Sequence, residues 1–154
     1  MTQSASGRSR RIVVGVDGSP SSVSALRWAI SEAELCGDTV EAVAVWEYPL
    51  SASEFGWEPG IADKLRRVRA SAEEALARAV SDARPPRSAA GIQQRVVEGY
   101  APKVLVAESA EADLLVVGSR GHGTLSDVLL GSVSQHCAHH SRCPLVIIRG
   151  QPGT

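Results

Sequence analysis

Apolar and polar residues alternate with two different periods along this chain, and the change of period predicts the order of its elements. Five short runs are almost continuously apolar and rich in Val, Ile and Leu, as is typical of strands buried on both faces. We expect these strands to span Arg11–Val16, Val40–Trp46, Ile92–Val97, Asp113–Val117 and Pro144–Arg149. The sheet that they form should therefore be covered on both sides.

Helical periodicity separates these apolar runs. Ser19 can cap a helix whose apolar positions recur every three or four residues until Gly37. Similar spacing predicts a longer helix over 61–80 and a short one over 102–109. Residues 47–60 carry Pro, Ser and Gly without a period, which predicts a loop long enough to act as a lid or to stay disordered.

A last helix should begin directly after Gly131. The stretch Ser132–Gln135 fits the capping-box pattern, in which the Ser132 hydroxyl would cap its own helix. A ligand at the helix start would compete for the same hydroxyl. The hydroxyl would then cap the helix when the site is empty and contact the ligand when the site is occupied.

Strands that alternate with helices predict parallel pairing, because a helical crossover returns the chain to the same end of the sheet. We expect a doubly wound α/β fold with one five-stranded parallel sheet in the order 3-2-1-4-5 and helices on both faces. This architecture is Rossmann-like and similar to that of the adenine nucleotide alpha hydrolases. One domain over 11–150 accommodates it, with a flexible arm over 1–10 and a flexible tail over 151–154.

Composition narrows the classes of function. A net charge of -1 gives no overall field for nucleic acid or anionic lipid, and Arg8, Arg10 and Arg11 form only a short basic arm. No apolar run approaches the roughly 20 residues of a membrane span, and no secretory signal is visible, so we expect a cytoplasmic protein. The three cysteines lack a paired framework, which favours free thiols in a reducing compartment.

The chemistry should gather at the carboxyl ends of two strands. In the order 3-2-1-4-5 the chain crosses over in opposite directions from the first and fourth strands, which leaves a crevice for a ligand. The first strand ends in the turn Gly15–Ser19 and the fourth in Gly118–Gly121. Glycines let backbone N–H groups approach an anion closely, and the helix start after Gly131 supplies more of them. The crevice therefore predicts a cradle for phosphates.

The spacing Gly118-x2-Gly121-x9-Gly131-Ser132 resembles the G-x2-G-x9-G-[S/T] signature of the ATP-binding branch of the universal stress protein family. The similarity covers most of the chain, because residues 11–30 look like that family's opening strand and helix and residues 131–149 like its closing helix and strand. This resemblance implies an ATP-binding regulator of the stress response, with Mg²⁺ or Mn²⁺ beside the phosphates and an unknown protein partner. It also implies a homodimer formed through the strand Pro144–Arg149.

The resemblance further implies roles for single residues. Asp17 would contact the ribose or a phosphate-bound metal ion, and Val45 would meet the adenine through its backbone. Val117 would line the pocket, and Gly15 can offer only backbone where the family usually has a contact. The phosphates would be surrounded by Gly118, Arg120, Gly121, Gly131, Ser132, Val133 and Ser134.

Some of these features have purely structural alternatives. Asp17 stands before Gly-Ser-Pro, where aspartate is common as a turn or cap residue. Arg120 can be a solvated loop residue instead of an anion ligand.

Near the end of the chain stands a cluster of side chains that can bind metal ions, namely His136, Cys137, His139, His140 and Cys143. No second cluster completes a four-ligand site, and imidazoles in the last turns of a helix also complement its negative end, so we expect no structural metal there.

The residues leave three functions open, of which a regulator that binds ATP is favoured. A slow ATPase or phosphotransferase would use Asp17 for the metal, Arg120 for charge and His122 for proton transfer. The lysine of G-x4-G-K-[ST] is missing, however, since the lysines are Lys64 and Lys103. The third function is a scaffold of the same fold that binds no nucleotide, and the intact glycine motif argues against it.

Overall fold

The structure is a computed structural model that describes residues 7–47, 59–121 and 130–150. In chain order its elements are β1 (Arg11–Gly15), α1 (Pro20–Cys36), β2 (Thr39–Trp46), α3 (Ile61–Ala83), β3 (Ile92–Glu98), α4 (Ala101–Ser109), β4 (Leu114–Gly118), α5 (Ser132–His140) and β5 (Leu145–Ile148). Every expected strand and helix is present. Most of the loop predicted over 47–60 lies outside the described residues, as do His122, the first residues of the predicted arm and the tail.

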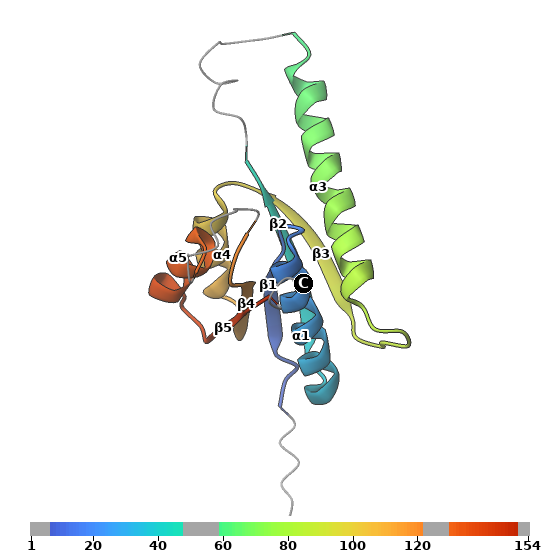
Figure 1. The fold of residues 1–154 in the computed structure, drawn as a ribbon, viewed down its shortest axis with the longest axis vertical. Helices are drawn as coiled ribbons and strands as arrows, with labels where there is room; N and C mark the ends of the chain where they lie inside the picture. The colour runs from blue at the N-terminus through green and yellow to red at the C-terminus, as the bar shows by residue number, and fades with distance from the viewer. Residues whose placement is uncertain (1–6, 48–58, 122–129, 151–154) are drawn as a thin grey trace, which may run out of the picture.

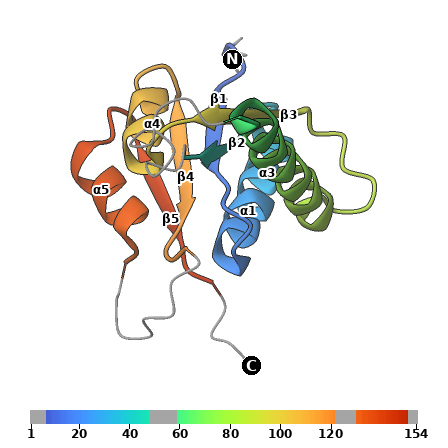
Figure 2. The same ribbon diagram turned by 90° about the horizontal axis from the view of Figure 1, so that it is seen from above.

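The strands form one parallel sheet in the order β3-β2-β1-β4-β5, which confirms the predicted topology. Figures 1 and 2 show three layers, in which α1 and α3 cover one face of the sheet and α4 and α5 cover the other. The chain leaves β1 and β4 in opposite directions across the sheet. The carboxyl ends of these two neighbouring strands therefore border the crevice that this topology creates.

Successive strand residues feed two apolar clusters, one on each face of the sheet. Ile12 and Val14 pack with residues of α1 and α3, whereas Val13 packs with Leu105 of α4 and Cys137 of α5. All five side chains are at most 3% exposed. Two-sided burial explains why the central strands are continuously apolar and do not alternate with polar residues.

Both ends of α1 follow from residues that the sequence singles out. The Ser19 hydroxyl accepts a hydrogen bond from the backbone N–H of Ser22 at 3.2 Å and so caps the first turn. Gly37 ends the helix with a φ of 73°, in the left-handed region that favours glycine. Its N–H donates to the carbonyl of Ala33 at 2.8 Å. Ser19 and Gly37 thus define the two ends of the helix.

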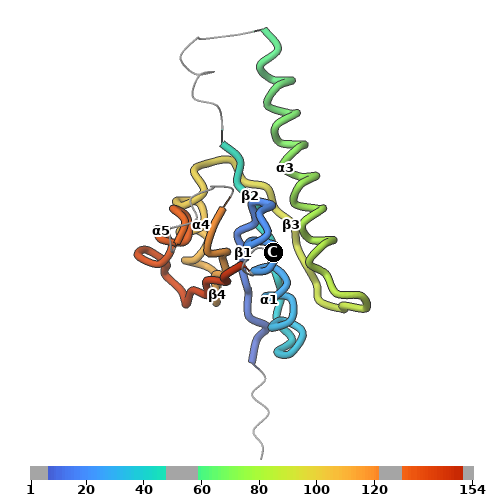
Figure 3. Tube along the Cα trace, viewed as in Figure 1, coloured from blue at the N-terminus to red at the C-terminus, as the bar shows by residue number. Residues whose placement is uncertain are grey.

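The long helix α3 (Ile61–Ala83) has its buried residues in its second half. It continues to Ala83, three residues beyond the expected end at Val80. Its buried residues are Leu76, Ala79, Val80 and Ala83. The first turns extend past the end of β2, as the trace in Figure 3 shows.

The start of α5 differs in one respect from expectation. The helix begins after Gly131, as predicted, but Gly131 itself is the N-cap residue and no side chain caps the first turn. Ser132 already lies inside the helix, so the capping box predicted for Ser132–Gln135 is wrong. The Ser134 hydroxyl instead donates to the carbonyl oxygens of Gly131 at 3.0 Å and of Ser119 at 3.1 Å. This contact links the helix start to the end of β4.

A closed ring of ion pairs on the α4 side of the sheet was not anticipated from the sequence. Arg11 of β1 pairs with Glu41 of β2 at 2.8 Å and with Glu108 of α4 at 3.0 Å. Arg95 of β3 pairs with the same two carboxylates, at 2.6 and 2.5 Å. Burial disfavours the charged form of Glu108, but hydrogen bonds from Arg95 and Arg11 outweigh burial and lower its pKa. The ring joins three strands to the end of α4.

The residues just before β1 are held against the domain by charge. The guanidinium of Arg8 lies 2.7 Å from the carboxylate of Asp113. Arg10 binds Asp38 both through its backbone N–H at 2.9 Å and through its guanidinium at 2.7 Å. Burial raises the pKa of Asp38, but the hydrogen bonds from Arg10 lower it more.

Among the helices described, none is both long and apolar enough to cross a membrane.

Candidate functional site: a pocket at the carboxyl ends of β1 and β4

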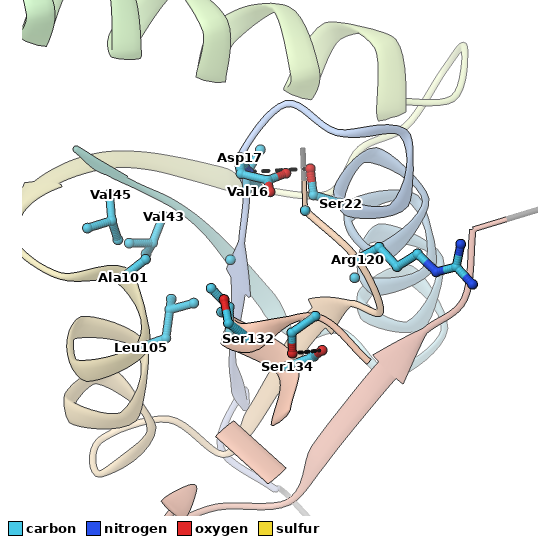
Figure 4. Close-up of a pocket in the computed structure, with 15 residues that line it drawn as sticks. Val16, Asp17, Ser22, Val43, Val45, Ala101, Leu105, Arg120, Ser132 and Ser134 are labelled. Atoms are coloured by element: carbon cyan, nitrogen blue, oxygen red, sulfur yellow. Dashed lines mark hydrogen bonds between the residues drawn. The ribbon is translucent and has the colours of Figure 1, made fainter. Parts of the chain in front are cut away.

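A pocket opens where β1, β2 and β4 end and where α1 and α5 begin, and α4 closes its side (Figure 4). The sequence-predicted crevice is therefore a real feature of the fold. Its lining residues are Gly15, Val16, Asp17, Ser22, Val43, Val45, Ala101, Leu105, Gly118, Arg120, Gly121, Gly131, Ser132, Val133 and Ser134. They come from segments up to about a hundred residues apart.

Asp17 serves the turn before α1 and also faces the pocket. Its Oδ1 accepts a hydrogen bond from the N–H of Ser19 at 2.9 Å, and its own N–H donates to the Ser22 hydroxyl at 3.3 Å. Its second carboxylate oxygen lies at the glycine segment, because a Cβ atom built on Gly121 would be 2.8 Å from Oδ2. The turn interpretation and the pocket interpretation of Asp17 therefore hold together.

Hydrogen bonds hold residues 118–121 between the starts of two helices. On one side, the Arg120 N–H donates to the Ser21 hydroxyl at 3.4 Å and the Ser19 hydroxyl donates to the Arg120 carbonyl at 3.3 Å. On the other side, the Gly131 N–H donates to the Ser119 carbonyl at 2.7 Å. This part of the glycine segment is thus a tethered wall of the pocket.

The close packing of this wall explains its glycines. A Cβ atom on Gly118 would lie 2.4 Å from the Ser21 hydroxyl oxygen and 2.7 Å from the Ser21 carbonyl carbon. A Cβ atom on Gly131 would lie 3.4 Å from the backbone of Arg120. Side chains at these positions would push the starts of α1 and α5 away from residues 118–121.

The start of α5 adds a positive end to the pocket. The first N–H groups of a helix have no partner within the helix, and its dipole is positive there. Gly131 provides no side-chain cap, and Ser132 is exposed at this end. Such a helix start beside a glycine-rich strand end suits an anion, above all a phosphate.

The opposite end of the pocket is apolar. Figure 4 shows the side chains of Val43, Val45, Ala101 and Leu105 gathered on one side and those of Ser132 and Ser134 on another. The side chain of Leu105 also occupies the space next to Gly15, since a Cβ atom on Gly15 would be 2.7 Å from Leu105 Cδ1. The pocket can therefore hold a molecule with an apolar ring at one end and an anionic group at the other.

Residues 8–149 match the sequence family described as the universal stress protein family. The chain belongs to the universal stress protein family. The match covers all the strands and helices described above.

Sequence relatives of this universal stress protein are found in mycobacteria. It is 34% identical over 148 residues to a universal stress protein of Mycobacterium tuberculosis, covering 91% of this chain and 48% of the relative. It is 36% identical over 138 residues to one of Mycobacterium bovis, covering 90% of this chain and 45% of the relative. The chain thus spans about half the length of these relatives.

Solved structures of universal stress proteins share the fold. The UspA protein from Lactobacillus plantarum superimposes with a TM-score of 0.75 at 23% identity, covering 92% of this chain and 99% of that one. A universal stress protein in complex with cAMP gives a TM-score of 0.57 at 26% identity, covering 93% and 98% of the two chains. One from Archaeoglobus fulgidus in complex with dAMP gives 0.52 at 19% identity, covering 90% and 97%.

In this universal stress protein the predicted site residues line the pocket, with one exception. The exception is Val117, which is 2% exposed and is not among the lining residues, so its predicted contact with the nucleotide stays a prediction. Arg120 lines the pocket, but its guanidinium points away from the other labelled side chains (Figure 4). Its backbone is what the hydrogen bonds to Ser19 and Ser21 place at the pocket.

Several lining residues were missed in the sequence, namely Val16, Ser22, Val43, Ala101 and Leu105. Weak signals for three of them exist. Val43 lies two positions before Val45, on the same face of a strand, and Ala101 and Leu105 are one turn apart on a helix. Only the packing of α4 over β1 and β2 makes these positions part of the pocket.

The histidine and cysteine side chains of α5 and the turn after it do not form a site with three or more protein ligands. Within the described ranges, no group of three or more His, Cys, Asp or Glu side chains is placed to hold a metal ion. Cys137 points into the core and is fully buried. The histidines of the last turn lie at the negative end of α5, as the structural alternative predicted.

Proposed function

We propose that this universal stress protein binds ATP in the pocket at the carboxyl ends of β1 and β4 and acts as a nucleotide-dependent regulator. The observation that carries this proposal is the joining of an apolar end with a glycine-lined helix start in one pocket. An adenine ring suits the first and a chain of phosphates suits the second.

The residues of the pocket fit the two ends of ATP. Val45 would offer its backbone to the adenine edge, while Val43 and Leu105 would pack against the ring. Asp17, at the turn between the two ends, would bind the ribose or a Mg²⁺ or Mn²⁺ ion on the phosphates. The bound ion would neutralise phosphate charge beside this carboxylate.

The phosphates would lie against the tethered glycine wall and the start of α5. A Cβ atom on Gly121 would press on Asp17 and one on Gly131 on the backbone of residues 119–121, so glycine at both positions would let the protein close around the phosphates. Ser132 is not needed as a helix cap, so its hydroxyl would be available to a phosphate oxygen. Ser134 is engaged with backbone carbonyls and would contribute chiefly through its backbone N–H.

Two related structures support an adenine nucleotide as the ligand. They are universal stress proteins in complex with cAMP and with dAMP, and each covers nine tenths or more of both chains. Both ligands carry an adenine and a phosphate, which are the two groups that the pocket would accommodate under this proposal. The preference for ATP rests on the spacing Gly118-x2-Gly121-x9-Gly131-Ser132.

Binding is favoured over turnover by the absence of a lysine from the glycine segment and by the position of Arg120. In phosphoryl transfer a cation is needed close to the transferred group. The Arg120 guanidinium points away from the pocket side chains, so it would have to turn to serve this purpose. We therefore infer that ATP is held and not rapidly hydrolysed.

The test is to purify the protein from cells, denature it and identify the released nucleotide by mass spectrometry. About one adenine nucleotide per chain supports the proposal. Phosphate release by the native protein should be slow, and it should fall further in Asp17→Ala if Asp17 holds the metal. A nucleotide-free preparation that also shows no calorimetric response to ATP, AMP or cAMP would overturn the proposal.

We also propose a homodimer through the strand Pro144–Arg149. The support is the position of β5 at the edge of the sheet and the partial exposure of all four of its residues. An apolar edge strand invites pairing with another strand. Light scattering should give twice the mass of the chain at micromolar concentration, and a monomer mass there would contradict this proposal.

A further inference from the structure

Helix α5 carries two imidazole rings that the nucleotide pocket does not use. His136 and His140 lie one helical turn apart, with ring centres 4.5 Å apart and ring planes inclined by 41°. His136 is half-buried and His140 is exposed, so solvent reaches the pair. In the described part of the chain no hydrogen bond or ion pair occupies their ring nitrogens.

The neighbouring side chains of metal-binding type are less suitably placed. The ring of His139 lies 6.3 Å from that of His140 and is inclined to it by 58°. Cys137 is fully buried in the apolar core. The thiol of Cys143 is engaged with the carbonyl oxygen of Pro144 at 3.4 Å. A metal ion on α5 would therefore have two protein ligands, with water in its remaining positions.

The separation of the two rings matches a particular metal geometry. With metal–nitrogen bonds of about 2.0–2.1 Å, a metal ion lies roughly 3.2 Å from the centre of each imidazole ring. Two rings bound at 90° to each other then have centres about 4.5 Å apart, whereas tetrahedral ligands would have centres about 5.2 Å apart. The observed 4.5 Å equals the separation expected at adjacent positions of a square-planar or octahedral ion toward which each ring turns one nitrogen.

We propose that His136 and His140 form a two-imidazole chelate site on the surface of α5 for a late first-row divalent metal ion, of which Cu²⁺ and Ni²⁺ fit the geometry best. Both ions accept imidazole nitrogen and favour 90° ligand angles, and Cu²⁺ binds most tightly in the divalent series. The site is separate from the ion that ATP would bring to Asp17.

A metal ion at this site would link two turns of the same helix whose start forms the phosphate end of the pocket. The two ligands lie at positions i and i+4, so one ion would span a full turn of α5. The ion would bind the helical state more tightly than the unfolded chain, and would therefore raise the melting temperature of the protein. This effect requires no nucleotide, so the site can be tested whether or not ATP binds.

The experiment is a calorimetric titration of the full chain with Cu²⁺ in a buffer that does not bind metals. Wild type should bind one equivalent at α5, with an electron paramagnetic resonance spectrum showing two nitrogen ligands. Loss of an outer-shell partner already costs roughly 10–100-fold in metal affinity, so loss of a ligand in His136→Gln or His140→Gln should cost at least tenfold. His139→Gln is the matched control and should keep the affinity within about twofold.

Melting curves provide a second readout, in which the comparison of variants separates the α5 site from other Cu²⁺ sites on the chain. Added Cu²⁺ should raise the melting temperature of wild type and of His139→Gln, but not of the other two variants. The proposal is overturned if either of those variants binds Cu²⁺ like wild type, or if His139→Gln loses affinity to the same extent. It is also overturned if wild type binds no more tightly than one free imidazole.

Discussion

Asp17 and Gly121 meet across the pocket although they are more than a hundred residues apart in the chain. A Cβ atom at position 121 would lie 2.8 Å from Oδ2 of Asp17. The carboxylate is fixed by its hydrogen bond from the Ser19 N–H at the start of α1. The glycine follows Arg120, whose backbone is hydrogen-bonded to Ser19 and Ser21. One helix start thus positions both sides of the proposed phosphate site.

The end of β4 should not tolerate any side chain at position 118. A Cβ atom there would lie within 3 Å of the backbone of Ser21 and Ser22, which cannot move without shifting the start of α1. We expect Gly118→Ala to lower the free energy of unfolding by about 1–3 kcal/mol or more, measured by urea denaturation. Gly91→Ala is the control, because nothing lies within 4 Å of its Cβ position, and it should change stability by less than about 0.5 kcal/mol. Equal stability of the two variants would contradict this packing.

The ion-pair ring should make the fold sensitive to acid. The pKa of Glu108 is lower in the folded chain than in the unfolded one. Its stabilising contribution is therefore present above about pH 4.3, the ordinary value for glutamate, and is lost as the pH falls through the lower folded-state pKa. Arg95→Met removes two of the ion pairs and should cost about 1–2 kcal/mol at pH 7.

The measurement is the free energy of unfolding as a function of pH for wild type and Arg95→Met. The difference between the two should be largest near neutral pH and shrink below pH 4, where the carboxylates become protonated. Arg66→Met is the control, because it breaks only an exposed pair with Asp63 and should cost less than about 0.5 kcal/mol. A pH-independent effect of Arg95→Met would show that the ring contributes packing and not charge.

The cysteines should differ widely in reactivity. Burial raises the pKa of the Cys137 thiol to about 11, with a smaller contribution from Cys143, and the side chain is fully buried. Cys36 is exposed at the end of α1. At pH 8 we expect iodoacetamide to modify Cys36 rapidly and Cys137 only after unfolding in urea, as peptide mass spectrometry would show. Modification of both at one rate in the native protein would contradict the burial of α5 against the sheet.

The fold could be predicted from the sequence because local patterns and topology agree. Apolar runs such as Leu114–Val117 indicated strands buried on both faces, and the glycine at position 37 indicated the end of the first helix. The strand order then placed the carboxyl ends of β1 and β4 together. The polar half of the pocket followed directly, since Asp17 and the glycines stand at those strand ends.

The remaining features depend on side-chain packing between distant segments. Val117 and Val45 both lie near strand ends, but only the structure shows that, of the two, Val45 is a lining residue of the pocket. Leu105 lines the pocket because α4 lies over Gly15. No local sequence pattern predicts this packing. Glu41 was visible as a charge within an apolar strand, but its partners on β1 and β3 become evident only from the pairing register.

The central claim is that the pocket binds ATP between the glycine wall and the start of α5. Its most direct test is calorimetric titration of ATP with Mg²⁺ into wild type and Gly121→Val, with Gly91→Val at the opposite end of the sheet as the control. A valine at 121 would press on Asp17 and fill the phosphate cradle. We predict one ATP per chain for wild type and Gly91→Val, and affinity reduced by at least about tenfold in a folded Gly121→Val. Wild-type affinity in folded Gly121→Val, or no binding by wild type, would contradict the account.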